Sequence, residues 1–349
     1  MTKTPSSASP SLYEDKRIIS MPVRYLINIV AIAVFMLIGN LIISEGIKNR
    51  TYTTILLQVG VYIILAVSLN ISTGYLGQLP LGHAGFMAVG AYVGALAWKA
   101  MPHGLGYMII GLIVAGIAAG IVGIIIGIPA LRLRGDYLAI LTLGFGEIIR
   151  IIIINLPDIT GGTPGLLNIP KYSNFNVIFI FVILTCYIIH TMMKSRHGRA
   201  ILSIRENEIA AEACGINTTY YKVMAFSVSA ALAGVAGCLY GGLQGSLFPS
   251  AFGFMDSINI LVMVVLGGMG SMIGSVLAAS VLTALPAMLQ FLASYRMVIY
   301  SVLLILVMIF KPSGLMGTYD FSLTGLIEKA IIKIRGGSKN NAKEGQANE

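Results

Sequence analysis

The chain has 349 residues, of which 56% are hydrophobic and 11% are charged, and its mean hydropathy is +0.86. Soluble globular proteins of this length carry much more charge, so this composition excludes a mainly soluble protein. The formal charge of +9 does not indicate a nucleic-acid partner, because the Lys and Arg residues stand beside apolar runs, as in membrane proteins.

The first apolar run, 23–43, predicts a transmembrane helix. It is too long for the apolar part of a signal peptide and has no small-residue cleavage site. Two longer runs, 51–98 and 257–295, contain no Asp, Glu, Lys or Arg. A crossing needs about 20 apolar residues, so each run is long enough for two crossings, with turns marked by glycine at 74–80 and 267–271.

Uncharged turns at membrane depth are tolerated only where protein or a polar cavity covers the backbone, and they are typical of transporters. These two turns are the predicted route of the transported molecule, with the candidate residues Gly77, Gln78, His83, Gly267 and Gly270. Asn70 and Gln78 more commonly satisfy the freed backbone groups. A lone intramembrane histidine such as His83 is more often a hydrogen-bond donor in packing than part of a pathway.

The sequence predicts an all-α polytopic membrane protein of about ten transmembrane helices with broken or re-entrant segments. Candidate spans are 23–43, 53–71, 81–98, 106–128, 137–155, 175–193, 223–244 and 297–310, with two more in 257–295. Ten spans with both termini cytoplasmic place most of the 23 Lys and Arg residues inside. The predicted parts are a cytoplasmic tail 1–22, a transmembrane domain 23–310 and a second cytoplasmic tail 311–349.

The loop 194–222 is the longest internal polar segment. It contains good helix formers from Arg199 to Cys214, and Gly215 stands where a left-handed C-terminal cap is expected. An uneven apolar face is formed by Ala200, Ile201, Ile204, Ile209 and Ala211, and another face carries Arg205, Glu208 and Glu212. The two glutamates are four residues apart, so their repulsion requires an external cation. The helix is either a solvated loop helix or an element that docks into another protein.

Charged and catalytic residue types are scarce elsewhere. Glu147 and Arg150 are three residues apart inside a predicted span, where charges usually pair or face a cavity. A structural ion pair is favoured over a substrate contact.

The run 158–164 lies in an outer loop, which either forms ordinary turns or meets a binding protein. The three cysteines, Cys186, Cys214 and Cys238, have no metal or disulfide spacing, and the absence of a phosphate-loop motif excludes that route to ATP.

The loop sequence from Gly198 to Asn217 resembles the coupling loop of LivM-type permeases, the membrane subunits of bacterial branched-chain amino-acid ABC importers. Further matching motifs, in the same order, are 74–84, 142–150, 160–165, 264–271 and 311–315. The resemblance implies an inner-membrane, multi-pass permease that is not an enzyme and binds no cofactor. It also implies partners, namely a LivH-type second permease, two cytoplasmic ATPases that bind the ATP, and an extracytoplasmic binding protein. The general importer pattern Glu-Ala-Ala-x-x-x-Gly is altered here, because the carboxylates stand at Glu208 and Glu212.

Two other classes of membrane protein would need polar residues within the spans. A secondary, ion-coupled amino-acid transporter would need intramembrane carboxylates, and Glu147 is the clear candidate. An intramembrane enzyme would need a polar catalytic cluster, which the spans do not contain.

The orientation can be tested at the C-terminal tail. We expect a reporter fused after Lys339, or a cysteine placed there for accessibility labelling, to report a cytoplasmic position, because this side collects the basic residues. Labelling of Lys339 from outside the cell would contradict the ten-span topology.

Overall fold

The computed structural model describes residues 50–102, 104–133 and 135–288, with scattered positions between 295 and 315. The elements are α2 (Arg50–Asn70), the π-helical turn η2 (Ile71–Tyr75), α3 (His83–Ala100), α4 (Leu105–Ala130), α5 (Asp136–Ile154), α6 (Pro157–Thr160), α7 (Phe175–Lys194), α8 (Arg196–Glu206), α9 (Glu208–Ala213), α10 (Thr218–Gln244), the 3₁₀ turn η3 (Pro249–Phe252), α11 (Phe254–Gly267) and α12 (Met272–Met288). Within these ranges there is no strand, only the isolated bridge between Leu166 and Leu247. The predicted all-α class is confirmed.

Five of the described helices are long and apolar enough to cross a membrane, namely α2, α4, α5, α7 and α10. The run 257–295 contains two shorter apolar helices, α11 and α12, as predicted. α3 corresponds to the predicted span 81–98. The first predicted span, 23–43, and the tail 1–22 lie outside the described residues, as do half of 297–310 and nearly all of 311–349. The count of ten and the orientation therefore stay predictions.

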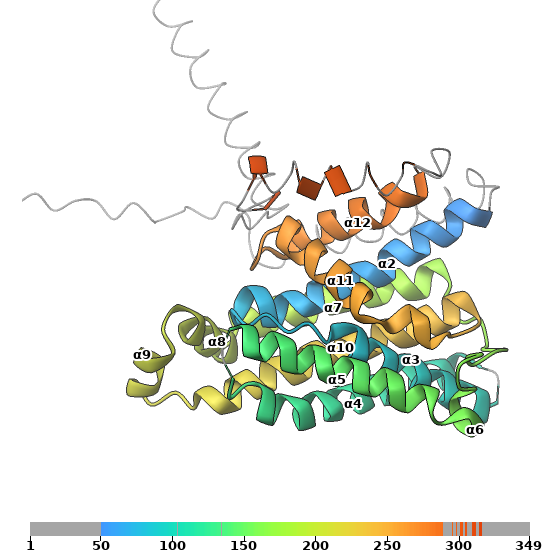
Figure 1. Cartoon of the computed structure of the whole chain (residues 1–349), viewed down its shortest axis with the longest axis horizontal. Helices are drawn as coiled ribbons and strands as arrows, with labels where there is room; N and C mark the ends of the chain where they lie inside the picture. Colours follow the sequence, from blue (N-terminus) through green and yellow to red (C-terminus); the bar gives the residue numbers. More distant parts are fainter. Residues whose placement is uncertain are drawn as a thin grey trace, which may run out of the picture. The chain divides into compact units, whose positions relative to one another are not determined.

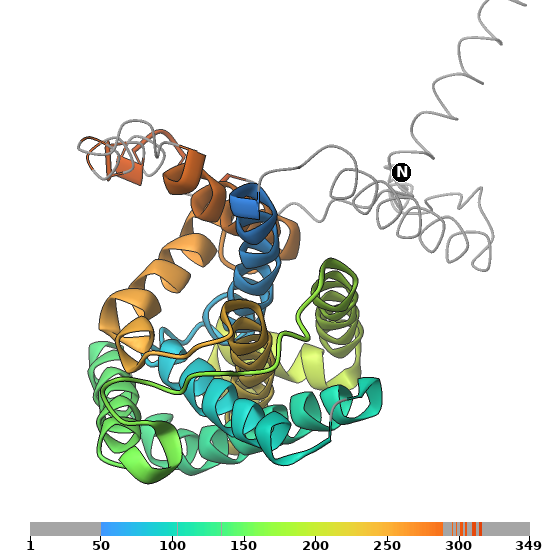
Figure 2. The ribbon, with the colours of Figure 1, turned by 90° about the vertical axis from the view of Figure 1, so that its right-hand side faces the viewer.

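α10 forms the centre of the described bundle, with α2, α3 and α4 around it (Figure 2). Its inner positions are small, so neighbouring backbones approach closely, as in other membrane helix pairs. A side chain at Gly234 would collide with Ala119 of α4, and one at Gly90 of α3 would collide with the Gly234 backbone. One residue of α10 thus sets the spacing to two neighbouring helices.

The short helices α8 and α9 lie at one end of the bundle, and α6 lies at the other (Figure 1). The turn after α2 lies at the α8 end, where η2 packs against α8. At the α6 end, Leu166 and Leu247 exchange two backbone hydrogen bonds, and Ile169 N–H donates to the Gly245 carbonyl at 3.0 Å. The segment that follows α6 is thereby attached to the last turn of α10.

Candidate coupling site

Asn70, the last residue of α2, joins the two uncharged turns. Its side-chain oxygen accepts a hydrogen bond from the Gly270 N–H at 2.9 Å, and its amide nitrogen donates to the Ser271 carbonyl at 3.1 Å. Asn70 is fully buried, where unpaired backbone groups are costly. The prediction that Asn70 satisfies the freed backbone is confirmed. Gln78 contributes through its backbone, whose N–H donates to the Ser72 carbonyl at 2.9 Å.

Gly74 lies where the two turns come closest together. It belongs to the π-helical turn η2, a departure from the α-helix that often occurs at functional sites. A Cβ atom at Gly74 would collide with the Gly270 backbone nitrogen and with the Asn70 side-chain oxygen. Glycine is therefore required here, because any side chain would push the two turns apart.

Arg205 connects α8 to this junction. Its Nη1 donates a hydrogen bond to the Gly74 carbonyl at 2.9 Å, and its Nη2 pairs with Glu206 Oε1 at 2.7 Å. The bond to Gly74 is charge-assisted, which makes it stronger than a bond between neutral groups. The stem of Arg205 passes Gly77, where an added Cβ would lie 2.9 Å from Arg205 Cγ. One side chain of the loop 194–222 thus holds the turn between α2 and α3.

The loop contains two helices, so the prediction of one helix from Arg199 to Cys214 is wrong. α8 ends at Glu206, and the next residue, Asn207, has an extended backbone. The side-chain oxygen of Asn207 accepts a hydrogen bond from the Ala210 N–H at 3.0 Å. Asparagine bonds to nearby backbone groups and so favours a helix start over a helix interior. This local bond divides the helix.

The predicted cap at Gly215 is confirmed. Gly215 has a φ of +82°, its N–H donates to the Glu212 carbonyl at 2.9 Å, and the Ile216 N–H donates to the Ala211 carbonyl at 3.1 Å. These two bonds form a Schellman motif, the usual end of a helix with a left-handed glycine. A Cβ atom at Gly215 would meet no other atom within 4 Å, so a substitution there strains the backbone without a clash.

The two glutamates of α9 are bound to the start of α10. Glu208 Oε1 pairs with Lys222 Nζ at 2.6 Å, and Glu212 Oε1 accepts from the Thr218 hydroxyl at 2.6 Å. Lys222 is buried. The expectation that these carboxylates need an external cation is therefore wrong, because Lys222 of the same chain supplies it.

The apolar face predicted for the loop is buried against the bundle at Ala200, Ile201, Ile204 and Ala211. Ile209 departs from this prediction, since 72% of its surface is exposed. The break at Asn207 turns Ile209 away from the bundle. Tyr220, at the start of α10, is also exposed. An exposed isoleucine and tyrosine at the end of a bundle provide apolar contact area for another protein.

His83 lies in the packed interior, at the start of α3. Its Nε2 is 3.0 Å from the Ser68 hydroxyl, and that hydroxyl donates its one hydrogen to the Leu65 carbonyl. This buried hydrogen bond between His83 and Ser68 agrees with the packing role. The adjacent Ala84 N–H donates to the Ser257 hydroxyl of α11 at 3.1 Å, so the segment after the first turn is fixed to two helices.

The proposed route along Gly77, Gln78, His83, Gly267 and Gly270 stays a prediction. A route along these turns predicts that bulky replacement of Gly77 or Gly270 blocks uptake, but the geometry gives these glycines a second role. Both have positive φ values, +74° and +88°, and a Cβ at Gly270 would lie 3.4 Å from Arg205 Nη1. A loss of transport in such variants would therefore also report displacement of Arg205.

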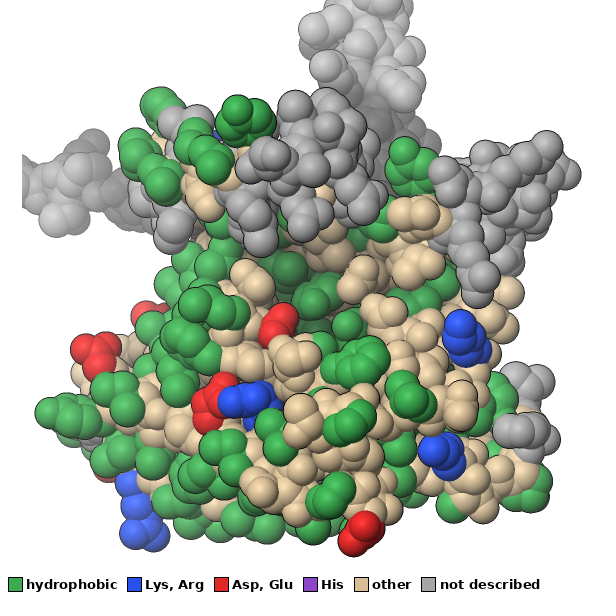
Figure 3. All heavy atoms as spheres, turned by 45° about the vertical axis from the view of Figure 1, so that its right-hand side comes forward, with side chains coloured by type: hydrophobic (Ala, Val, Ile, Leu, Met, Phe, Trp, Pro, Cys, Tyr) green, Lys and Arg blue, Asp and Glu red, His purple; other side chains and the backbone are tan. Residues whose placement is uncertain are grey.

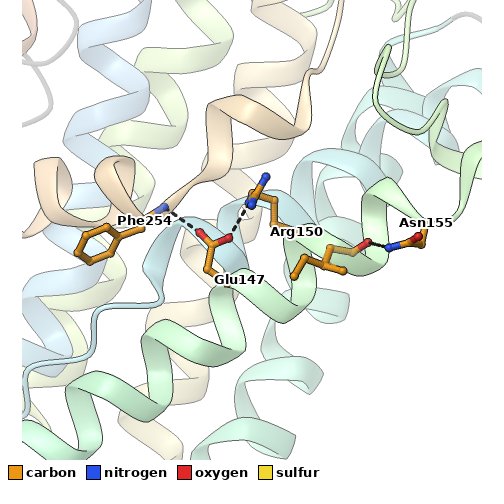
Figure 4. Close-up of polar contacts among 5 residues, drawn as sticks. Glu147, Arg150, Asn155 and Phe254 are labelled. Atoms are coloured by element: carbon orange, nitrogen blue, oxygen red, sulfur yellow. Dashed lines mark hydrogen bonds and ion pairs between the residues drawn. The ribbon is translucent and has the colours of Figure 1, made fainter.

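The predicted ion pair of α5 forms, with Arg150 Nε 2.7 Å from Glu147 Oε2 (Figure 4). The other oxygen of Glu147 accepts from the Phe254 N–H at 3.1 Å. Phe254 is the first residue of α11, and a carboxylate at a helix start is stabilised by the helix dipole. Glu147 thereby fixes α11 to α5, a contact that the sequence did not reveal.

Of the contacts that the sequence analysis missed, the one made by Asn70 has a weak sequence signal. Asn70 is a lone amide in a long charge-free run, and such a group must find buried partners. Its partners Gly270 and Ser271 stand in the other charge-free run, which also has a glycine turn. Nothing local to Arg205 indicates its bond to Gly74.

Comparisons with known proteins show the family of the chain. A family model described as a branched-chain amino acid transport system permease component matches residues 51–308. The chain is 37% identical over 328 residues to the high-affinity branched-chain amino acid transport system permease protein LivM of Escherichia coli (strain K12), covering 84% of this chain and 75% of the relative. It is 39% identical over 290 residues to LivM of Salmonella typhimurium, covering 73% and 68%. It is 27% identical over 287 residues to LivH of Salmonella typhimurium, covering 73% and 91%. No solved structure matches the chain.

Replacement of Asn70 by leucine tests the junction of the two turns. It leaves the Gly270 N–H and the Ser271 carbonyl unpaired in a buried site, at about 1–3 kcal/mol for each group. We expect a clear loss in thermal stability of the purified protein in detergent. Ser280→Ala is the matched control, since among the described residues the Ser280 hydroxyl bonds only to Val276 of its own helix. Equal melting temperatures for the two variants would contradict the role of Asn70.

Proposed function

Since the chain belongs to the family of permease components of branched-chain amino acid transport systems, we propose that it translocates branched-chain amino acids across the bacterial inner membrane in an ATP-driven importer. In this complex the chain is the multi-pass membrane subunit, paired with a second permease of the LivH type. Two cytoplasmic ATPases bind the ATP, and an extracytoplasmic protein delivers the amino acid. The chain itself carries out no chemical step and needs no cofactor.

We propose that α8, α9 and the start of α10 form the ATPase-docking element. The contact of Arg205 with Gly74 is the observation that best supports it, because a docking element must act on the membrane helices. A shift of α8 pulls on the Gly74 carbonyl and, through Asn70, on the turn between α11 and α12. Glu208 and Glu212 shape this element by binding α10, and the exposed Ile209 provides contact area.

The alternative of an ion-coupled secondary transporter has less support. It would use Glu147 as the titrating carboxylate, but both oxygens of Glu147 are engaged, one by Arg150 and one by the Phe254 N–H. The membership in a permease family of transport systems fits the importer.

Arg205→Gln tests the coupling. Loss of a hydrogen bond to a charged group costs about 1.5–3 kcal/mol, and 1.4 kcal/mol corresponds to a tenfold change. We expect uptake of leucine, isoleucine or valine by the assembled complex to fall about tenfold or more, while the ATPases still co-purify. Glu206→Gln is the control, because it removes the exposed partner of Arg205 and leaves the bond to Gly74. Equal uptake in Arg205→Gln and wild type would refute the coupling role.

Gly215→Val tests docking by a different means. A β-branched residue in the left-handed conformation costs about 1–2 kcal/mol, which displaces α9 without a clash. We expect reduced ATPase stimulation by substrate-loaded binding protein, with normal membrane insertion. Gly215→Asn should stay near wild type, because asparagine tolerates this conformation. If Gly215→Val kept full stimulation, α9 would not be part of the docking element.

A further inference from the structure

Two of the outer faces of the described bundle, on α4 and on α5, differ in chemistry. The exposed residues of α4 are aliphatic apart from Tyr107 near its start, and they include Ile113, Ile117, Ile121 and Ile125. α5 is the least buried of the five long apolar helices. Beside its exposed isoleucines it carries the ion pair Glu147–Arg150, whose side chains are 29% and 31% exposed. The aliphatic surface of α4 is suited to contact with lipid. The surface of α5 carries charged side chains and is better suited to contact with protein.

The depth of the ion pair decides this point. Glu147 stands 11 residues after Asp136 and 7 before Ile154, which is about 16 Å and about 10 Å from the two ends of α5 at the helical rise. Both distances place it well inside an apolar layer about 30 Å thick. A charged side chain exposed to lipid there costs about 2.5–3.5 kcal/mol or more. Lipid is therefore a poor neighbour for this part of α5.

Arg150 adds a requirement for hydrogen-bond acceptors. Its guanidinium turns back toward Glu147, away from the nearer end of α5, so it does not reach for the membrane surface (Figure 4). The Nε–H of Arg150 donates to Glu147. The terminal Nη groups of Arg150 have no hydrogen-bond acceptor among the described residues. A protein neighbour with carbonyl, amide or carboxylate oxygens at this depth would satisfy them.

The neighbouring part of α11 extends the same face. Its first turn begins at Phe254, whose N–H donates to Glu147, and carries Asp256, with exposed Met255 and Asn259 on the outside. On this side of the molecule, acidic and basic side chains gather beside a hollow in a largely apolar surface (Figure 3). A Cβ at Gly144 of α5 would meet no atom within 4 Å, which leaves room for a close helix contact.

We propose that this α5–α11 face, made by Ile140, Gly144, Glu147, Ile148, Arg150 and Ile151 with Met255 and Asn259, binds the second permease subunit. The inference rests on the proposed function, which supplies a second permease as partner. Two kinds of permease protein, LivM and LivH, are similar to this chain, so the partner is a helical membrane chain of the same family. Apolar side chains around a polar centre suit such a partner better than lipid.

The test is site-specific photocross-linking in the complete complex. The photoreactive residue p-benzoylphenylalanine replaces Ile148 of α5 or, as the control, Ile121 of α4, whose exposed fractions are 51% and 52%. We expect the adduct with the second permease, identified by mass spectrometry, to be at least tenfold more abundant from position 148. Adducts with lipid or with the same chain at position 148, or equal yields at both positions, would overturn the inference.

Two further measurements keep the outcome clear. If the Ile148 variant does not insert, Ile140 of α5 replaces it, with Ile117 of α4 as its control. Uptake by the wild-type complex tests the proposed function separately. Normal ATP-driven uptake without cross-linking at α5 would refute this interface alone, whereas cross-linking without amino-acid uptake would refute the proposed substrate and leave the interface standing.

Discussion

The arrangement of the described helices depends on one constraint, that backbone groups freed in an apolar interior must find partners within the protein. The side chain of Asn70 meets this constraint for the turn between α11 and α12, with one donor and one acceptor. The bonds hold only if the turns touch, which is why Gly74 and Gly270 have no side chains between them. Arg205 then completes the junction at the Gly74 carbonyl.

The docking element has two separate attachments to the bundle. α8 reaches the junction of the uncharged turns through Arg205, and α9 reaches the start of α10 through Glu208 and Glu212. The hinge between them is Asn207, whose extended backbone separates the two helices.

The sequence predicted those features that depend on local pattern. Hydropathy located the described long apolar helices and the two shorter ones, α11 and α12, because a membrane helix needs a minimum length of apolar residues. The glycine cap at 215 followed from helix-end chemistry. The helix break at Asn207 was missed, because the surrounding helix formers outweighed one residue that prefers a helix start.

Contacts between distant residues could not be predicted from this sequence. Arg205 and Gly74 are 131 positions apart, and Asn70 and Gly270 are 200 apart. Neither pair leaves a periodic pattern, since hydropathy reports which face of a helix is buried and not which residue it meets. Even the Glu208–Lys222 pair, only 14 positions apart, depends on the loop folding back at Gly215. The sequence pattern therefore located these residues along the chain and did not indicate their partners.

α10 has a mechanical consequence for the whole chain. It is bound at its start to α9, and at its end Gly245 and Leu247 are bound to the segment after α6. With 27 residues it is a stiff rod about 40 Å long. Because close backbone contacts hold this rod near its middle, a tilt of α10 would move its two ends in opposite directions. The backbone of one helix would then connect the two ends of the bundle mechanically.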